Sequence, residues 1–127
     1  VMGRMSDSPR IALILGGTGG IGSALARRLH ADGCRVVLAA RDPQRPAALA
    51  AELGAESIPT DATDPAAVEA AVAFAFERHG RLDAAANCVG SILLKPAHLT
   101  SPEEFSRTIA LNLGTAFNLV RSAAKVM

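Results

Sequence analysis

Apolar and polar positions fall into blocks along the chain, and the spacing changes from strand-like to helix-like between blocks. A continuous apolar run at Ile11–Leu15 predicts a strand buried on both faces. From Ile21 to Leu29, apolar residues recur at three- and four-residue spacing, which predicts a helix that ends by Gly33. Arg35–Ala40 predicts a second strand. These elements fit in about 30 residues, the size of a strand–helix–strand unit with parallel strands.

The same change of pattern repeats further along the chain. Helical spacing predicts helices over Pro46–Leu53 and Pro65–His79, and a glycine follows each of them. Asp64, with a proline after it, has the pattern of a helix N-cap. A short strand at Glu56–Pro59 separates the two helices. The chain therefore continues to alternate strand with helix, as proteins with a parallel sheet do.

A fourth strand, a loop and a long helix complete the pattern. The strand covers Leu82–Asn87. Ser101, with Glu104 three residues later, has the pattern of a capping box and predicts a helix from Pro102 towards the end of the chain. The apolar residues on one face of this helix are Phe105, Ile109, Leu113, Ala116, Phe117 and Val120.

This order of elements predicts an α/β fold with a Rossmann-type doubly wound parallel sheet. We expect the sheet to be incomplete at its C-terminal side, because the fourth strand's far edge and the last helix's apolar face lack a cover. At 127 residues, the chain has the length of one domain. We expect this domain at residues 10–127 and a flexible N-terminal segment at residues 1–9, which lack the apolar core of a signal peptide.

Charge and cysteine content argue against several classes of function. The 13 basic and 12 acidic residues leave a net charge of +1, so we expect no surface for nucleic acid or an anionic membrane. Cys34 and Cys88 are far apart, and reduced thiols in a cytoplasmic protein are favoured over a disulfide. Cysteines and histidines lack metal-site spacing, and no apolar run is long enough to cross a bilayer.

The glycine-rich turn between the first strand and the first helix is the strongest candidate for a ligand site. Its glycines permit a tight turn and close approach of the backbone to a pyrophosphate, while the helix N-terminus offers free N–H groups. Such a motif is weak by itself, but a buried strand precedes it and an amphipathic helix follows. We therefore predict a nucleotide cofactor rather than an empty turn. The contacting residues are expected to be Gly16, Thr18, Gly19, Gly20, Ile21 and Gly22.

Four segments of the chain, in order, resemble motifs of the short-chain dehydrogenase/reductase family. Leu15–Gly22 resembles the family's T-G-x-x-x-G-x-G turn, with leucine in place of threonine, and its spacing also fits the T-G-x-x-G-x-x-G of the extended branch. Asp61–Asp64 resembles D-V-T-D, and Leu82–Gly90 resembles a fourth strand that ends in N-N-A-G. Asn112–Thr115 resembles N-x-x-G. The chain thus resembles the N-terminal half of a protein of this family.

The resemblance implies an NAD(P)-dependent oxidoreductase that transfers a hydride between a nicotinamide cofactor and a small carbonyl or alcohol substrate. It implies that Asp61 accepts from the adenine amino group and that the Ala62 N–H contacts the ring edge. A turn aspartate bonded to local backbone is the alternative for Asp61. The resemblance also implies that Asn87, Val89 and Gly90 line the adenine ribose, although the chain has C-V where the motif has N-A.

The end of the second strand bears on the choice between NAD and NADP. An acidic residue there accepts from a ribose 2′-hydroxyl and repels a 2′-phosphate, but Ala40 stands at this point and Arg41 follows. A guanidinium suits a phosphate through its charge and its paired N–H donors. We therefore predict NADP as the cofactor, with NAD as the second choice. The alternative is a solvated Arg41 paired with Asp42.

Asn112 is the one residue that matches the family's catalytic residues. It lies near the apolar face of the last helix, where we expect a buried amide that needs partners. A structural role is one interpretation; by resemblance, it is an auxiliary residue that helps to hold a water near the active-site lysine. The family's catalytic serine, tyrosine and lysine follow this segment, and the chain contains no tyrosine.

We therefore expect that the chain alone catalyses nothing. The parent protein is expected to be an NADP-preferring enzyme that forms homo-oligomers. A non-catalytic dinucleotide-binding module is the alternative. A methyltransferase-like Rossmann domain is a third interpretation, which the Asp61, Asn87 and Asn112 segments argue against.

Overall fold

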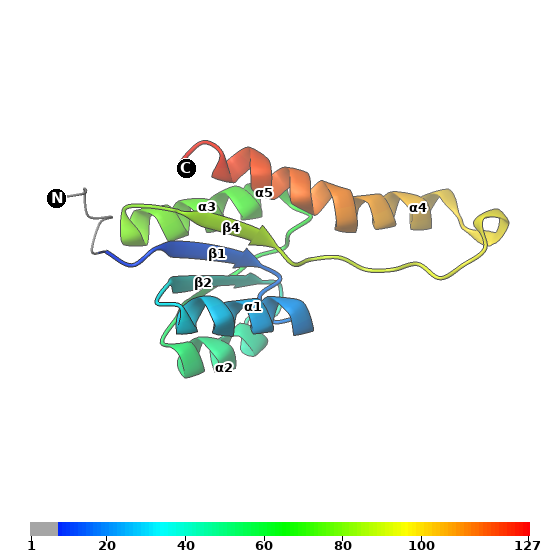
Figure 1. Cartoon of the computed structure of the whole chain (residues 1–127). Coiled ribbons are helices and arrows are strands. Elements are labelled where there is room, and N and C mark those ends of the chain that lie inside the picture. Colours follow the sequence, from blue (N-terminus) through cyan, green and yellow to red (C-terminus); the bar gives the residue numbers. More distant parts are fainter. Residues whose placement is uncertain (1–7) are drawn as a thin grey trace.

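The computed structural model describes residues 8–127 and contains a sheet of four parallel strands in the order β3-β2-β1-β4 (Figure 1). The strands are β1 (Ile11–Leu15), β2 (Arg35–Ala40), β3 (Glu56–Pro59) and β4 (Ala84–Asn87). This confirms the α/β Rossmann-type fold and places β4 at an edge, on the side where the sheet was expected to be incomplete. The expected flexible segment, residues 1–9, lies mostly outside the described residues.

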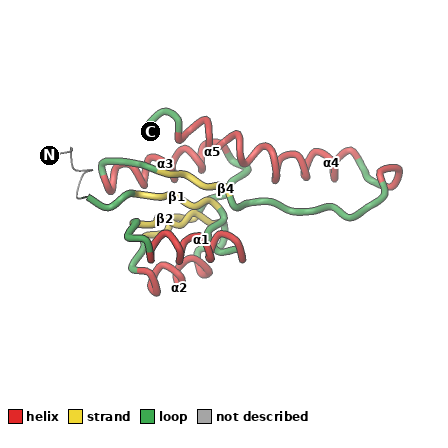
Figure 2. Tube along the Cα trace, viewed as in Figure 1, coloured by secondary structure: helices red, strands yellow, loops and turns green. Residues whose placement is uncertain are grey.

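Helices cover both faces of the sheet (Figure 2). They are α1 (Gly20–Ala31), α2 (Gln44–Leu53), α3 (Pro65–His79), α4 (Pro102–Ile109) and α5 (Thr115–Ala123). α1 and α2 pack on one face, and α3 and α5 pack on the other. A short 3₁₀ turn at Ala97–Leu99 precedes α4, and a π-helical turn at Ala110–Gly114 joins α4 to α5.

Strand β1 is buried on both faces, which explains its unbroken apolar sequence. Leu13 packs in the layer with α3 and α5, Ile14 packs in the layer with α1 and α2, and both are 0% exposed. Because successive strand side chains point to opposite faces, a polar residue anywhere in this run would enter one core or the other. The predicted bounds of β1, β2 and β3 are confirmed.

The predicted start of helix α2, Pro46, was wrong, because the helix begins at Gln44. The Asp42 carboxylate accepts from the Gln44 N–H (2.9 Å), which satisfies one of the unpaired donors at the helix start. Proline is tolerated within a first helical turn, so Pro46 does not mark the boundary.

The predicted start of β4 was also wrong, since the strand begins at Ala84 rather than Leu82. The Ile11 N–H, at the start of β1, donates to the Asp83 carboxylate (2.8 Å). A side chain thus takes a donor that the backbone ladder would otherwise use, and regular pairing starts one residue later.

The last helix is interrupted, and its largest apolar residues do not face the sheet. The exposed apolar face comprises Phe105, Ile109, Leu113, Phe117 and Val120, which are 62, 43, 65, 62 and 68% exposed. The buried side of α5 instead carries Thr115, Asn118, Leu119, Ser122 and Ala123. Small side chains let α5 approach the sheet closely, while α4 and the segment before it extend beyond the sheet (Figure 1). The expectation that this apolar face stays uncovered is confirmed.

Candidate functional site

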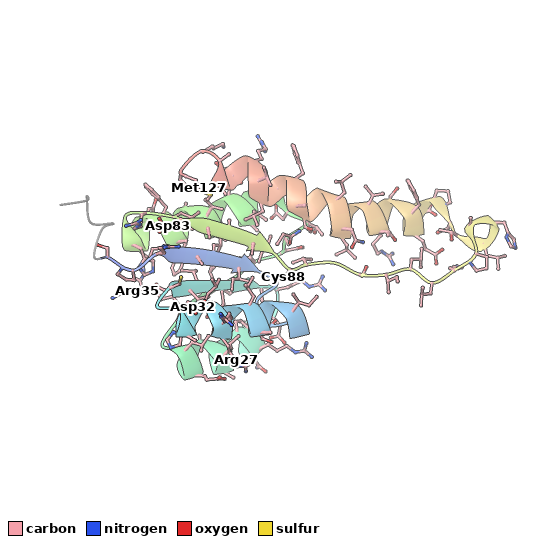
Figure 3. The ribbon with its side chains drawn as sticks, viewed as in Figure 1. Arg27, Asp32, Arg35, Asp83, Cys88 and Met127 are labelled. Carbon is pink, nitrogen blue, oxygen red and sulfur yellow. The ribbon has the colours of Figure 1, made fainter. Side chains whose placement is uncertain are left out.

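The carboxyl ends of the parallel strands open into a cleft of about 330 Å³, the strand-end cleft. β2 and β4 lie on opposite sides of β1, so the connections after β1 and β4 leave the sheet towards opposite faces, and a crevice forms between them. Figure 3 shows Cys88 at this end of the sheet, whereas Asp83 and Arg35 lie at the other. The cleft is lined by Gly16, Thr18, Gly19, Ala40, Arg41, Asp42, Arg45, Thr60, Asp61, Ala62, Thr63, Cys88, Val89, Gly90 and Leu111.

Most of the residues predicted to contact a cofactor lie together in this cleft, although they come from four separate segments. The predicted residues that line it are Gly16, Thr18, Gly19, Arg41, Asp61, Ala62, Val89 and Gly90. Five others are not part of its lining, and they are Gly20, Ile21, Gly22, Asn87 and Asn112.

Two glycines hold helix α1 close to the sheet. Gly16 has a φ of +76°, a backbone conformation that favours glycine, and a Cβ there would lie 2.8 Å from the Val89 side chain. A Cβ at Gly22 would overlap the Gly16 carbonyl oxygen. A side chain at either position would therefore push α1 or the β4 end away from β1.

The N-terminus of α1 is exposed. Gly19 is the N-cap residue, and it supplies no side-chain acceptor to the N–H groups of the first turn. A Cβ at Gly20 would meet nothing within 4 Å, and Ile21 is 80% exposed. An anion can therefore approach these N–H groups, which carry the positive end of the helix dipole.

Two arginines line the cleft beside the end of β2. Arg41 and Arg45 are both exposed, and neither makes a hydrogen bond or an ion pair with another residue of 8–127. The Asp42 carboxylate, the alternative partner of Arg41, accepts from the Gln44 N–H instead. Our sequence prediction missed Arg45. The sequence could have indicated Arg45, because it lies in the first turn of the helix that follows β2, and a parallel sheet places the starts of such helices near the carboxyl ends of its strands.

Asp61 follows β3 and makes hydrogen bonds within its own turn, as expected if it is a structural turn aspartate. Its Oδ1 accepts from the Thr63 N–H (3.0 Å) and from the Thr63 hydroxyl (2.7 Å). These bonds, with a smaller contribution from the charge of Arg41, hold the pKa of the Asp61 carboxyl below its ordinary value. The contact with an adenine ring stays a prediction. Asp64 caps α3 as expected, by accepting from the Ala66 N–H (3.1 Å).

The Asn87 side chain connects β4 to α5 and shapes the turn beside the cleft. Its Nδ2 donates to the Thr115 hydroxyl (3.0 Å), and its Oδ1 accepts from the Val89 N–H (3.1 Å). The Thr115 hydroxyl donates in turn to the Leu111 carbonyl (2.8 Å). Asn87 therefore acts on the cleft indirectly, by fixing the backbone of Val89 and Gly90.

Asn112 lies in the π-helical turn, and the expectation that its amide is buried was wrong, because the residue is exposed. Its Nδ2 donates to the Thr108 carbonyl (2.9 Å), and its Oδ1 accepts from the Ser91 N–H (3.1 Å). The polar residue avoids the core because the helix turns a different face to the sheet. Asn112 thus ties the segment after Gly90 to the helix, at the kind of π-turn that often marks functional sites.

Leu111, Thr60 and Thr63 also line the cleft and were missed. Leu111 comes from the π-helical turn, and no local pattern distinguishes it from the other leucines of that helix. Thr60 is buried, and its hydroxyl donates to the Ile58 carbonyl (3.2 Å). Thr63 lies in the Asp61–Asp64 segment, which the sequence had already indicated as part of the site.

Within residues 8–127, no group of His, Cys, Asp and Glu side chains could hold a metal ion. No helix in this described part of the chain is long and apolar enough to cross a membrane. Cys34 and Cys88 are free thiols, and burial raises the pKa of the Cys88 thiol. The strand-end cleft offers a ligand backbone N–H groups, two guanidiniums and the polar groups after β3 and β4.

A sequence model of the family described as short chain dehydrogenase matches residues 10–127. The 3-hydroxyacyl-CoA dehydrogenase type-2 of Rattus norvegicus is 35% identical over 125 residues, covering 92% of this chain and 48% of that protein. The D-threitol dehydrogenase of Mycolicibacterium smegmatis is 31% identical over 123 residues, covering 93% of this chain and 47% of that protein. A solved short-chain type dehydrogenase/reductase from Mycobacterium ulcerans matches with a TM-score of 0.89 at 30% identity, covering 97% of this chain and 48% of that one.

The chain spans about half the length of these relatives. The two named enzymes differ in the substrate that their names state, so similarity alone leaves the substrate open.

Proposed function

Since this chain belongs to the short-chain dehydrogenase family, we propose that it is the dinucleotide-binding part of an NAD(P)-dependent oxidoreductase. The reaction would be hydride transfer between a nicotinamide cofactor and a small carbonyl or alcohol substrate. One observation carries the proposal: the glycine-rich turn and the segments after β2, β3 and β4 meet in one cleft at the strand ends. We further propose that residues 10–127 work as a single domain.

The residues of the cleft fit a dinucleotide. The open N-terminus of α1, with no side chain at Gly20, suits a pyrophosphate, because backbone N–H groups and the helix dipole both favour negative charge. Asp61 and the Ala62 N–H would contact the adenine ring, and Val89 and Gly90 would line its ribose. When bound, the cofactor supplies the hydride acceptor or donor.

We propose NADP as the preferred cofactor and NAD as the second choice. Ala40, which ends β2, offers no carboxylate to a ribose 2′-hydroxyl. Arg41 lines the cleft at this point and has no ion pair within residues 8–127, so its guanidinium is available to a 2′-phosphate.

By its resemblance to the family, we propose that a tyrosine is the proton donor of the reaction. Because these 127 residues contain no tyrosine, the donor would come from another part of the parent protein. Asn112 would be an auxiliary residue, and its bonds to Ser91 and Thr108 support a positioning role.

For the parent protein we propose a homo-oligomer in the cytoplasm. The exposed apolar face of α4 and α5 supports association, and the free thiols fit a reducing compartment.

Calorimetric titration of the chain with NADPH tests the proposal. We expect saturable binding and a rise in the unfolding temperature with ligand concentration, because a ligand that binds only the folded state stabilises it. No heat of binding and no thermal shift at millimolar NADPH would contradict the proposal. Binding by the parent protein without turnover of any carbonyl would favour the non-catalytic module instead.

A further inference from the structure

Arg45 lies at the border between two hollows of the surface. It stands on the first turn of α2 and lines the strand-end cleft with Arg41. It also lines a shallow hollow of about 390 Å³ between α1 and α2, together with Arg27 and Glu52. Thr18, on the glycine-rich turn, is the other residue shared by both hollows. Arg45 therefore lies near both the end of β2 and the turn proposed to hold the pyrophosphate.

Two carboxylates that line these hollows, Glu52 and Asp42, accept hydrogen bonds from other donors. Both oxygens of Glu52 accept from Arg27, at 2.9 Å from Nε and 3.2 Å from Nη2. Figure 3 shows Arg27 on the side of α1 that faces α2. The Asp42 carboxylate accepts from the Gln44 N–H. The Arg45 guanidinium makes no ion pair with another residue of 8–127.

Elsewhere on the molecule, some arginines form ion pairs and others, such as the exposed Arg107, form none in residues 8–127. Arg28 pairs with Asp32, and Arg78 pairs with Glu56. Arg41 and Arg45 differ from these because both line one hollow, and neither makes a hydrogen bond or ion pair with another residue of 8–127. Like charges so placed repel each other weakly in solvent, and a phosphate dianion bound to both would remove the repulsion and accept several charge-assisted hydrogen bonds.

We infer that Arg45 is a second phosphate-binding residue, which holds a ligand phosphate together with Arg41 and makes the cleft selective for a 2′-phosphorylated adenosine. The inference rests on the proposed function, because that phosphate belongs to the cofactor. Two carboxylates, Asp42 and Asp61, also line the cleft. Each accepts local hydrogen bonds, and the charge of Arg41 also acts on Asp61, so Arg45 supplies a second positive charge for a phosphate.

Two small ligands test the inference, because they differ only in the phosphate. Adenosine 2′,5′-bisphosphate carries the 2′-phosphate and adenosine 5′-monophosphate lacks it. We expect Arg45→Ala to weaken the first ligand about tenfold, the size of one charge-assisted contact, and to leave the second unchanged in calorimetric titration. Arg45→Lys keeps the charge but not the paired donors, so we expect an intermediate loss.

The control variant is Arg107→Ala on α4, which removes an exposed arginine outside the cleft and should change neither affinity. Alanine is a good helix former, so both alanine variants should keep the fold, as unfolding curves can check. Equal affinity of wild type and Arg45→Ala for the bisphosphate, or an equal loss for both ligands, overturns the inference while the dinucleotide site stands. If the wild-type chain binds neither ligand, the proposed function itself fails.

Discussion

At the scale of single residues, helix α1 can lie close to the end of strand β1 because glycines stand at the contact, where other residues would carry a side chain. Gly22 lies against the Gly16 carbonyl oxygen, and a methyl group there has no room. Gly20, two positions earlier on the same helix, faces open space. The two glycines therefore have separate roles, one in packing and one in access.

Gly22→Ala should destabilise the fold. The added Cβ overlaps the Gly16 carbonyl oxygen, and crowding a packed contact in this way typically costs about 1–3 kcal/mol of unfolding free energy. Chemical denaturation followed by circular dichroism measures the loss. Gly20→Ala is the matched control, and its stability should stay within about 1 kcal/mol of wild type or rise, since alanine favours a helix. A stable Gly22→Ala variant would show that α1 can shift outward without cost.

Gly20→Val should weaken NADPH binding while the fold persists. Valine meets no protein atom near its Cβ, but its side chain would occupy the approach of a phosphate to the N–H groups of the first turn. We expect a loss of at least about tenfold in affinity by calorimetry. Unchanged affinity would remove this turn from the binding site.

At the scale of elements, one carboxylate joins the starts of two neighbouring strands. Asp83, just before β4, accepts from the Ile11 N–H of β1 and from the Arg81 guanidinium. These hydrogen bonds hold the pKa of the Asp83 carboxyl below its ordinary value. The bond from Arg81 lowers this pKa the most, and the bond from Ile11 lowers it further. Because the pKa falls on folding, the ionised group stabilises the folded state above the unfolded pKa, and this contribution is lost as pH falls through the folded pKa.

Asp83→Asn should therefore flatten the acid dependence of stability. Wild-type unfolding free energy should fall as pH drops below about 4, the ordinary carboxyl range, and the variant should lose part of that fall. Denaturant melts at neutral and acid pH measure both. Asp32→Asn, which breaks an exposed pair with Arg28, serves as the control and should change the profile less. Identical profiles for Asp83→Asn and wild type would contradict the prediction.

At the scale of the whole molecule, two layers of helix cover the sheet but leave the apolar face of α4 and α5 in contact with solvent. Leu113 is 65% and Phe117 is 62% exposed, and both lie on this face. Exposed apolar patches of this kind promote association. The molecule thus combines a well-packed core beside the strand-end cleft with an exposed apolar surface suited to contact with another protein surface.

The chain should self-associate through this face. Leu113→Ser with Phe117→Ser should lower the mass measured by light scattering after gel filtration and raise solubility, because it removes exposed apolar area. Arg121→Ser, a change at an exposed polar position of α5, is the control and should leave the mass unchanged. An unaltered mass for the double variant would mean that another surface mediates association.

The 127-residue chain should show no turnover. Delivery of a proton to the developing alkoxide by a positioned acid contributes about 10²–10⁴-fold, and the chain has no tyrosine to supply it. Asn112 cannot replace it, since an amide has no proton to give near neutral pH. Following NADPH absorbance with a panel of ketones tests this. Steady turnover that scales with chain concentration, and disappears in Gly20→Val, would contradict it.

The sequence by itself determined the order and type of the elements, because their signals are local. A short unbroken apolar run that ends in glycines, such as Ile11–Leu15, indicates a strand covered on both faces, and a helical repeat indicates a helix with one covered face. The positions of the glycine-rich turn and Arg41 followed from the same reasoning, since parallel strands bring their carboxyl ends to one edge. These are the parts of the fold and cleft that the structure places as expected.

Only the tertiary structure decided which surfaces meet. Helical periodicity marked the stripe with Phe117 as the most apolar, but α5 turns its smaller residues to the sheet, because close packing depends on shape as well as hydrophobicity. That choice exposes Asn112 and brings Leu111 to the cleft. The ion pair of Arg27 with Glu52 likewise joins two helices, a contact that no local pattern encodes.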